Sequence, residues 1–166
     1  MKRWPASSPT AAVTSPLKLC VRRLETPVHS GLPVEVSLQV PSEVGWIEES
    51  VELLARHCFA GFDPPTRLLF RFRVALSEAL ANAIVCGNQE DPDKPVEVRA
   101  ECHARYIRLH VSDQGCGFDP DQVPPPVGPA DLENCCGRGL FLIRNLMDEV
   151  RFNEHGNSIC MTLSRR

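Results

Sequence analysis

Lysine is scarce in this 166-residue chain: Lys2, Lys18 and Lys94 are its three lysines, and none lies within a glycine-rich segment. Also absent are the patterns G-x-x-x-x-G-K-S/T, G-x-G-x-x-G after a strand-like run, G-x-S-x-G and H-E-x-x-H. These absences argue against a P-loop nucleotidase, a dinucleotide-binding enzyme, a serine hydrolase and a zinc protease. If the chain holds a triphosphate, it must use helix N-termini, backbone N–H groups, arginine and a metal ion.

Long hydrophobic runs are lacking as well. No apolar stretch is long enough to cross a bilayer, and none follows Met1-Lys2-Arg3 as it would in a secretory signal. The net charge of −3 comes without a basic stripe, which gives no reason to expect nucleic-acid binding. We therefore expect a cytoplasmic protein that contacts neither a membrane nor nucleic acid directly.

The eight cysteines show no spacing typical of disulfides or structural zinc. Cys58, Cys86 and Cys160 lie in apolar periodic segments, where a thiol acts as a small hydrophobe. Cys116 and Cys135-Cys136 flank glycines in expected loops, where thiols can react but more often do not. Without a secretory signal, all eight are expected to be reduced thiols.

The chain divides near residue 33. Residues 1–33 are rich in Pro, Ser and Thr without a sustained period, which predicts a mobile tail or an irregular lead-in, and residues 34–166 form one domain. In that domain the patterns predict a strand over 34–40, a helix N-capped by Ser42 and ending near 60, a helix over 67–86, a hairpin of strands 96–102 and 106–112, a helix over 140–147, and a hairpin of 150–153 and 158–163. This order predicts an α/β (α+β) two-layer sandwich, in which a mixed, mostly antiparallel sheet carries helices on one face.

The helix expected over 67–86 carries both a core stripe and polar candidates. Glu78 and Asn82 are four residues apart, so they share one face of the helix within a strongly apolar sequence. A glutamate on such a helix most often faces solvent, and an asparagine often satisfies buried backbone groups. The expected core stripe consists of Leu69, Phe72, Leu76, Ala79 and Ala83.

Two glycine pairs follow. Gly115 and Gly117 come directly after the strand that ends at Ser112, behind Asp113, which alone would indicate an ordinary turn. A proline-rich segment then leads to Gly137-Arg138-Gly139, which opens a helix. The N–H groups and the positive dipole end of a helix start favour phosphate.

Three segments carry a family resemblance: ALSEALANA at 75–83, DQGCGFD at 113–119, and GRGLFLI at 137–143 continuing to LMDEV at 146–150. In this order they resemble the N-box and the two glycine boxes of the GHKL ATPase superfamily, and most of all its bacterial anti-sigma-factor serine/threonine kinases. The resemblance spans about Val34 to the C-terminus and implies the Bergerat-type ATP-binding fold. Cys86 stands where many relatives have histidine, and Cys135-Cys136 where some have arginine.

The resemblance also implies a role for each candidate residue, with ATP and Mg²⁺ as cofactors. Asn82 would be the Mg²⁺ ligand, Asp113 would accept the hydrogen bond of the adenine amino group, and Glu78 would be the general base on the attacking hydroxyl. Gly115 and Gly117 would let the chain pass close to the nucleotide. The expected lid over the phosphates runs from about Pro124 to Gly139 and includes Gly137 and Gly139, and Arg138 and Leu140 would also bind the nucleotide.

Three functions remain open from the sequence. The first is a kinase that phosphorylates an anti-anti-sigma antagonist protein and also sequesters a sigma factor. The second is a switch kinase without a sigma partner, and the third is a non-catalytic module whose ATP binding controls protein docking. Kinases of this resemblance commonly form homodimers.

Overall fold

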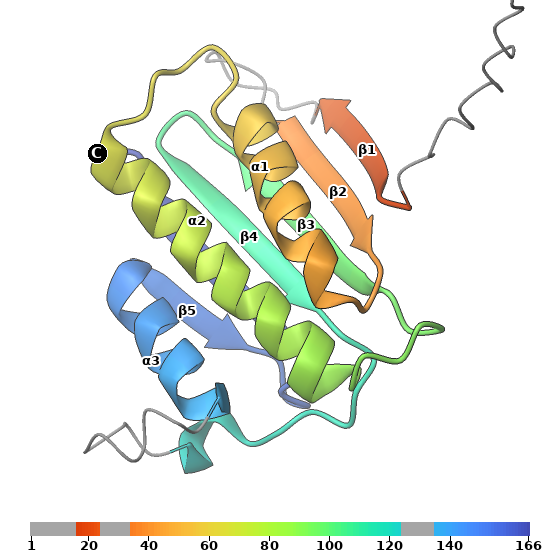
Figure 1. Cartoon of the computed structure of the whole chain (residues 1–166). Helices are drawn as coiled ribbons and strands as arrows, with labels where there is room; N and C mark the ends of the chain where they lie inside the picture. The colour runs from red at the N-terminus through yellow and green to blue at the C-terminus, as the bar shows by residue number, and fades with distance from the viewer. Residues whose placement is uncertain (1–15, 24–33, 124–134) are drawn as a thin grey trace, which may run out of the picture.

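Six strands form one sheet in the order β1-β2-β3-β4-β6-β5 in the computed structural model (Figure 1). The structure describes residues 16–23, 34–123 and 135–166, without the side chains of Cys135 and Cys136. The strands are β1 Lys18–Arg23, β2 Val34–Val40, β3 Val96–Cys102, β4 Tyr106–Ser112, β5 Glu149–Phe152 and β6 Ser158–Ser164. All five pairings are antiparallel, so the sheet is more uniform than the mixed sheet expected.

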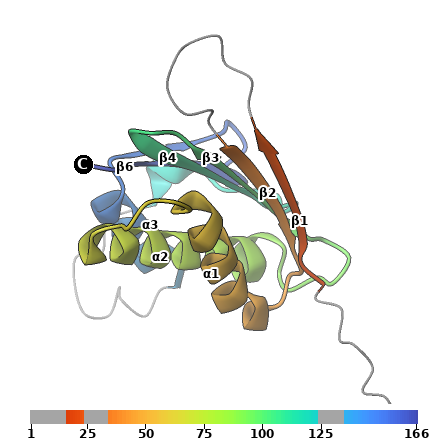
Figure 2. The same cartoon turned by 90° about the horizontal axis from the view of Figure 1, so that it is seen from above.

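Three helices cover one face of this sheet (Figure 2). They are α1 Ile47–Cys58, α2 Thr66–Ala81 and α3 Cys135–Leu146. Three short helical turns complete the described elements: η1 Val44–Trp46, η2 Asn82–Gly87 and η3 Pro120–Gln122. The two-layer architecture confirms the expected fold class, and no helix in the described parts of the chain is long and apolar enough to cross a membrane.

The core lies between the helices and the sheet. Buried residues alternate along β3 and β4, as the period of two requires when one face is covered. On α2 the buried face includes Phe72, Leu76 and Ala79, as expected, but Leu68 is buried where Leu69 was expected. Burying one such Leu or Phe side chain contributes about 1.5–3 kcal/mol, so this stripe holds α2 against the sheet.

β1 corrects the prediction of an irregular lead-in for Lys18–Arg23. Lys18–Arg23 is a regular strand that pairs with Val34–Gln39 of β2, rather than part of an irregular lead-in. Every residue of β1 is exposed, so backbone hydrogen bonding holds the strand and leaves no burial pattern in the sequence. Residues 1–15 and 24–33 lie outside the described residues.

Ser42 is not the N-cap that the sequence predicts. It is fully buried, where its Oγ donates to Lys94 O and accepts from Asn88 Nδ2 at 2.9 Å. The helical segment instead begins with η1 behind Glu43, and neither η1 nor α1 has a side-chain cap. Ser42 therefore joins two loops rather than starting a helix.

The helix expected over 67–86 changes type before it ends. α2 stops at Ala81, and Asn82–Gly87 continues as a π-helix in which Asn88 N donates to Ala83 O at 2.8 Å. Such turns are rare and frequently lie at functional sites. The wider turn leaves Cys86 exposed, so the prediction that Cys86 acts as a small hydrophobe is wrong, whereas Cys58 is buried as expected.

Candidate functional site

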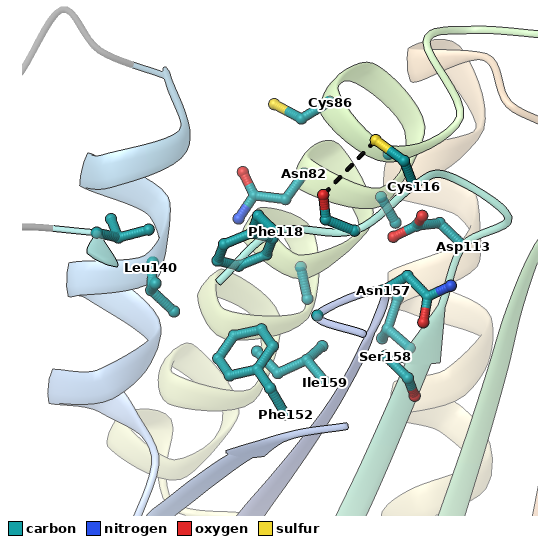
Figure 3. Close-up of a pocket in the computed structure, with 17 residues that line it drawn as sticks. Asn82, Cys86, Asp113, Cys116, Phe118, Leu140, Phe152, Asn157, Ser158 and Ile159 are labelled. Carbon is teal, nitrogen blue, oxygen red and sulfur yellow. Dashed lines mark hydrogen bonds between the residues drawn. The ribbon is translucent and has the colours of Figure 1, made fainter. Parts of the chain in front are cut away.

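A cavity of about 240 Å³ lies where α2, η2, the loop after β4, α3 and the β5–β6 hairpin meet (Figure 3). Its walls are mostly apolar with a few polar groups, which is typical of a small-molecule site. The lining residues are Ala79, Asn82, Ala83, Cys86, Gly87, Val111, Asp113, Cys116, Gly117, Phe118, Val123, Leu140, Phe152, Gly156, Asn157, Ser158 and Ile159.

Four of the residues predicted from sequence line this cavity: Asn82, Asp113, Gly117 and Leu140. They come from η2, the loop after β4, and α3, so the fold brings all three sequence segments to one place. The other predicted residues, Glu78, Gly115, Gly137, Arg138 and Gly139, are not part of its wall.

Asp113 is the carboxylate of the cavity. Its backbone N–H donates to Asn157 O at 3.0 Å, and its Oδ1 accepts from Gly115 N at 2.8 Å. Burial raises the pKa of Asp113 above its ordinary value, although the Gly115 N–H acts in the opposite direction. Among the described residues none donates to Oδ2, so this oxygen can accept a hydrogen bond from a ligand.

Gly87 provides the space that Asp113 occupies. A Cβ atom at residue 87 would lie 2.6 Å from Asp113 Oδ2, closer than real Cβ contacts come. On the other side, Gly115 packs directly against the Gly87 carbonyl. The sequence pattern marked Gly87 as the end of a helix and did not reveal that it makes room for the carboxylate.

Gly117 and Gly156 interlock two loops at the rim of the cavity. Both have a positive φ, 74° and 70°, and a Cβ at either would overlap a backbone carbonyl of the opposite loop, His155 O or Phe118 O. Glycine adopts this backbone region without steric cost. The close approach at Gly117 is therefore to the β5–β6 hairpin of this chain, a partner that the motif alone did not reveal.

Asn88 was missed as a site residue. Its side chain is 1% exposed and makes three hydrogen bonds: Oδ1 accepts from Gln114 N at 2.7 Å, and Nδ2 donates to Ser42 Oγ at 2.9 Å and to Lys94 O at 2.7 Å. It therefore ties the loop that carries Asp113 to two other segments. After Gly87 an asparagine indicates only a helix end, which is why its role could not be found from the sequence.

The second glycine pair lies inside α3, because the helix begins at Cys135 rather than after Gly139. A Cβ at Gly139 would lie 2.8 Å from Glu78 Oε2 and 3.2 Å from Asn82 Oδ1 and Nδ2. The absence of a side chain at residue 139 thus lets α3 approach Glu78 and Asn82, which are both half-buried. Residues 124–134 of the predicted lid lie outside the described residues.

Gly137 and Arg138 differ from Gly139 in their surroundings. A Cβ at Gly137 would meet nothing within 4 Å, and Arg138 is exposed. Leu140 is 4% exposed and closes the wall of the cavity from the α3 side. The start of α3 therefore has one side packed on α2 and one side open.

The oxygen atoms of the Asn82 and Glu78 side chains suit an Mg²⁺ ion that is coordinated in part by a bound ligand. They do not suit a metal ion that is coordinated by protein side chains alone. No cluster of three or more His, Cys, Asp or Glu side chains in the described parts of the chain could hold a metal ion. Asn82 supplies an amide oxygen and Glu78 a carboxylate, and both side chains lie close to Gly139 of α3. Mg²⁺ keeps several waters and needs only one or two protein oxygens when phosphates complete its shell.

Comparison with known proteins agrees with this geometry. The model of the histidine kinase-like ATPase domain matches residues 40–163. The serine-protein kinase RsbW of Bacillus subtilis is 35% identical over 97 residues, which cover 54% of this chain and 61% of that protein. RsbW of Listeria innocua is 27% identical over 136 residues (77% of this chain, 85% of that protein), and RsbW of Staphylococcus aureus strain JH9 is 34% identical over 98 residues (54% and 62%).

The alignments with the relatives and with the family model differ in how much of each protein they cover. The alignments with the Bacillus and Staphylococcus proteins span less than two thirds of those proteins, whereas the Listeria alignment spans most of its length. All three relatives are named serine-protein kinases. The family model covers most of the described domain, from the end of β2 to β6. The chain therefore belongs to the family of histidine kinase-like ATPase domains.

Proposed function

We propose that this chain is an ATP- and Mg²⁺-dependent serine/threonine protein kinase of the anti-sigma-factor type, which phosphorylates an anti-anti-sigma antagonist protein. The observation that carries the proposal is the approach of Gly139 to Glu78 and Asn82 next to the cavity that holds Asp113. One site thus offers a carboxylate for a nucleobase and, beside it, an amide oxygen, a second carboxylate and a helix start.

The Asp113 end of the cavity suits adenine. Asp113 Oδ2 would accept the hydrogen bond of the exocyclic amino group, while Oδ1 stays bound to Gly115 N. The cavity walls include Val111 and Ile159, and the rings of Phe118 and Phe152 meet edge to face with centroids 5.4 Å apart. A planar apolar heterocycle with one polar edge matches such a lining.

The α3 end suits the phosphates. The backbone around Gly137 is open, so a phosphate could approach the first N–H groups of the helix, where the dipole favours negative charge. Asn82 would hold Mg²⁺, which supplies charge neutralisation of the phosphates when bound. Arg138 is exposed next to this helix start and would add a positive charge.

Glu78 would act as the general base. It lies next to Asn82 at the α3 contact, and its carboxylate would take the proton of a serine or threonine hydroxyl as the hydroxyl oxygen attacks the terminal phosphorus. The bond between that phosphorus and the bridging oxygen breaks, and ADP leaves. The phosphorylated side chain belongs to the antagonist protein.

The partners and location are part of the same proposal. The names of the relatives specify kinases acting on serine in proteins, which supports a protein substrate. Sequestration of a sigma factor and a homodimeric state are proposed from the anti-sigma resemblance, and a cytoplasmic location is proposed with them. A switch kinase without a sigma partner, or a module that binds ATP without transferring phosphate, would share the same pocket.

Single-turnover transfer of labelled γ-phosphate tests the kinase assignment. The substrate is an antagonist protein captured from the native host by the ATP-loaded chain. Glu78→Gln should retain nucleotide affinity and lose about 10²–10⁴-fold in transfer rate, because the amide cannot take a proton. Glu49→Gln is the matched control, since Glu49 is exposed on α1.

The outcomes separate the alternatives. Transfer by Glu78→Gln at the wild-type rate would exclude Glu78 as the base. A wild-type chain that binds ATP and its partner but never transfers phosphate would favour the non-catalytic module. Transfer without any sigma factor among the captured partners would favour the switch kinase.

A further inference from the structure

Two cysteines line the cavity from different segments of the chain. Cys86 belongs to the π-turn η2, four residues after Asn82, and Cys116 lies between Gly115 and Gly117 in the loop after β4. Both are exposed, and Cys116 Sγ donates to Gly117 O at 3.6 Å (Figure 3). Neither thiol has a place in the proposed phosphoryl transfer.

The other described cysteines differ in their access to solvent. Cys58 and Cys102 are 2% and 9% exposed, and Cys160 is half-buried, where burial raises the pKa of its thiol. Cys20 is exposed on β1, at the edge of the sheet and outside the cavity lining. Because thiol chemistry requires an accessible thiolate, a small reagent in solution reaches Cys20, Cys86 and Cys116 before the other cysteines whose side chains are described.

We propose that Cys86 and Cys116 form a thiol-modification site inside the nucleotide pocket, so that disulfide exchange with a small disulfide and nucleotide binding exclude each other. This inference rests on the proposed function, since it takes the cavity to be the nucleotide site. The ligand class is a low-molecular-weight disulfide such as oxidised glutathione. The consequence is a kinase whose ATP binding depends on the thiol redox state of its surroundings.

The exchange is chemically complete without a further oxidant. The cysteine thiolate attacks one sulfur of the disulfide, the S–S bond breaks, and a mixed disulfide forms while the second half leaves as a thiolate that takes up a proton. A glutathionyl group on either wall adds a bulky, negatively charged tripeptide to a cavity of about 240 Å³. It would fill the space for the nucleotide and repel the phosphates.

The first test measures protection at each cysteine. The full chain is treated with oxidised glutathione with and without ADP, and the modified peptides are quantified by mass spectrometry over time. At an ADP concentration a hundredfold above its Kd, modification of Cys86 and Cys116 should slow about a hundredfold, because only the empty fraction reacts. Cys20 is the internal control and should react at the same rate in both samples.

The second test measures the converse effect. ADP affinity is titrated for treated and untreated samples of the wild type, Cys86→Ser, Cys116→Ser and the double variant. Treatment should weaken ADP binding strongly in the wild type, a reductant should restore it, and the ratio of treated to untreated Kd should return to one in the double variant. Using this ratio removes any effect of the substitutions on affinity itself.

The outcomes distinguish this inference from the function on which it rests. If the untreated wild type binds no nucleotide, the proposed function fails and the inference fails with it. If the untreated protein binds ADP but modification leaves the Kd unchanged, or ADP protects Cys86 and Cys116 no more than Cys20, only the inference is contradicted.

Discussion

Asn88 Oδ1 accepts a hydrogen bond of 2.7 Å from the backbone N–H of Gln114, 26 residues further along the chain. Gln114 follows Asp113 directly, so the buried amide of Asn88 fixes the loop that presents the carboxylate to the cavity. The same side chain holds Ser42 and the Lys94 carbonyl. The Asp113 end of the cavity thus depends on a residue that does not line it.

Asn88→Ala tests this positioning role. Removing the amide leaves Gln114 N without its partner, whereas Lys94 O keeps the hydrogen bond from Ser42 Oγ. An unpaired buried group costs about 1–3 kcal/mol. We expect a lower Tm and, at a temperature where the variant is still folded, weaker ADP binding by calorimetry. Asn145→Ala, which removes an exposed side chain of α3 and its one hydrogen bond to Phe141 O, is the control. A variant with reduced Tm but wild-type ADP affinity would show that Asn88 stabilises the fold without positioning the site.

The two glycines of α3 make a matched pair. Both lie within the helix, so replacing either by alanine gains about 1 kcal/mol of helix propensity. Gly137→Ala meets open space, whereas Gly139→Ala places a methyl group 2.8 Å from Glu78 Oε2 and forces Glu78 or α3 to move. We expect Gly139→Ala to lose Mg²⁺-dependent ATP affinity and phosphate transfer, and Gly137→Ala to keep the Mg²⁺ effect. Equal losses in the two variants would show that the contact with Glu78 is not the cause.

Arg71 and Asp148 connect α2, α3 and β6 and give the fold a pH dependence. Arg71 Nε donates to Leu146 O at 2.6 Å, its Nη2 lies 2.9 Å from Asp148 Oδ1, and Ser164 N donates to Asp148 Oδ2 at 2.6 Å. Burial alone would raise the pKa of Asp148, but the Ser164 N–H and the Arg71 guanidinium outweigh it and hold the pKa below its usual value. The charged form is therefore the one that stabilises the folded state.

The sign of the effect follows from linkage. A carboxyl group whose pKa is lower in the folded state stabilises that state at pH values above its pKa in the unfolded chain, which is about 3.9. This stabilisation is lost as the pH falls through the lower pKa of the folded state. Asp148→Asn should therefore lower the free energy of unfolding at neutral pH, and its difference from the wild type should shrink in acid. Urea unfolding across this pH range measures it. A difference that stays constant down to the acid limit would contradict the role of the charge.

The strands of the domain were predictable because the covered face of the sheet imposes an alternating pattern on the sequence. β2, β3 and β4 begin and end at the expected residues, and the last hairpin is right to within one residue at each boundary. β1 was not predictable, since its six exposed residues are held by backbone pairing with β2. The π-turn η2 could not be predicted, because its apolar residues continue the helical pattern of α2.

The site was predictable where a motif is local and not where contacts are long-range. Asn82, Asp113, Gly117 and Leu140 were found from three short segments, and all four line one cavity. Gly87, Asn88 and Gly156 act through partners 26 or more residues away, in the loop after β4. No local pattern carries that information, so their roles required the fold.

Calorimetric titration of ATP and ADP into the wild type and Asp113→Asn tests the central claim, that this cavity holds adenine through Asp113. The wild type should bind both nucleotides, more tightly with Mg²⁺ than with EDTA. Asp113→Asn should weaken both by about ten- to a hundredfold, because losing a hydrogen bond to a charged acceptor costs ~1.5–3 kcal/mol. Asp121→Asn removes the same charge from an exposed position of η3 and should bind like the wild type. Equal affinities of the wild type and Asp113→Asn for both nucleotides would contradict the account.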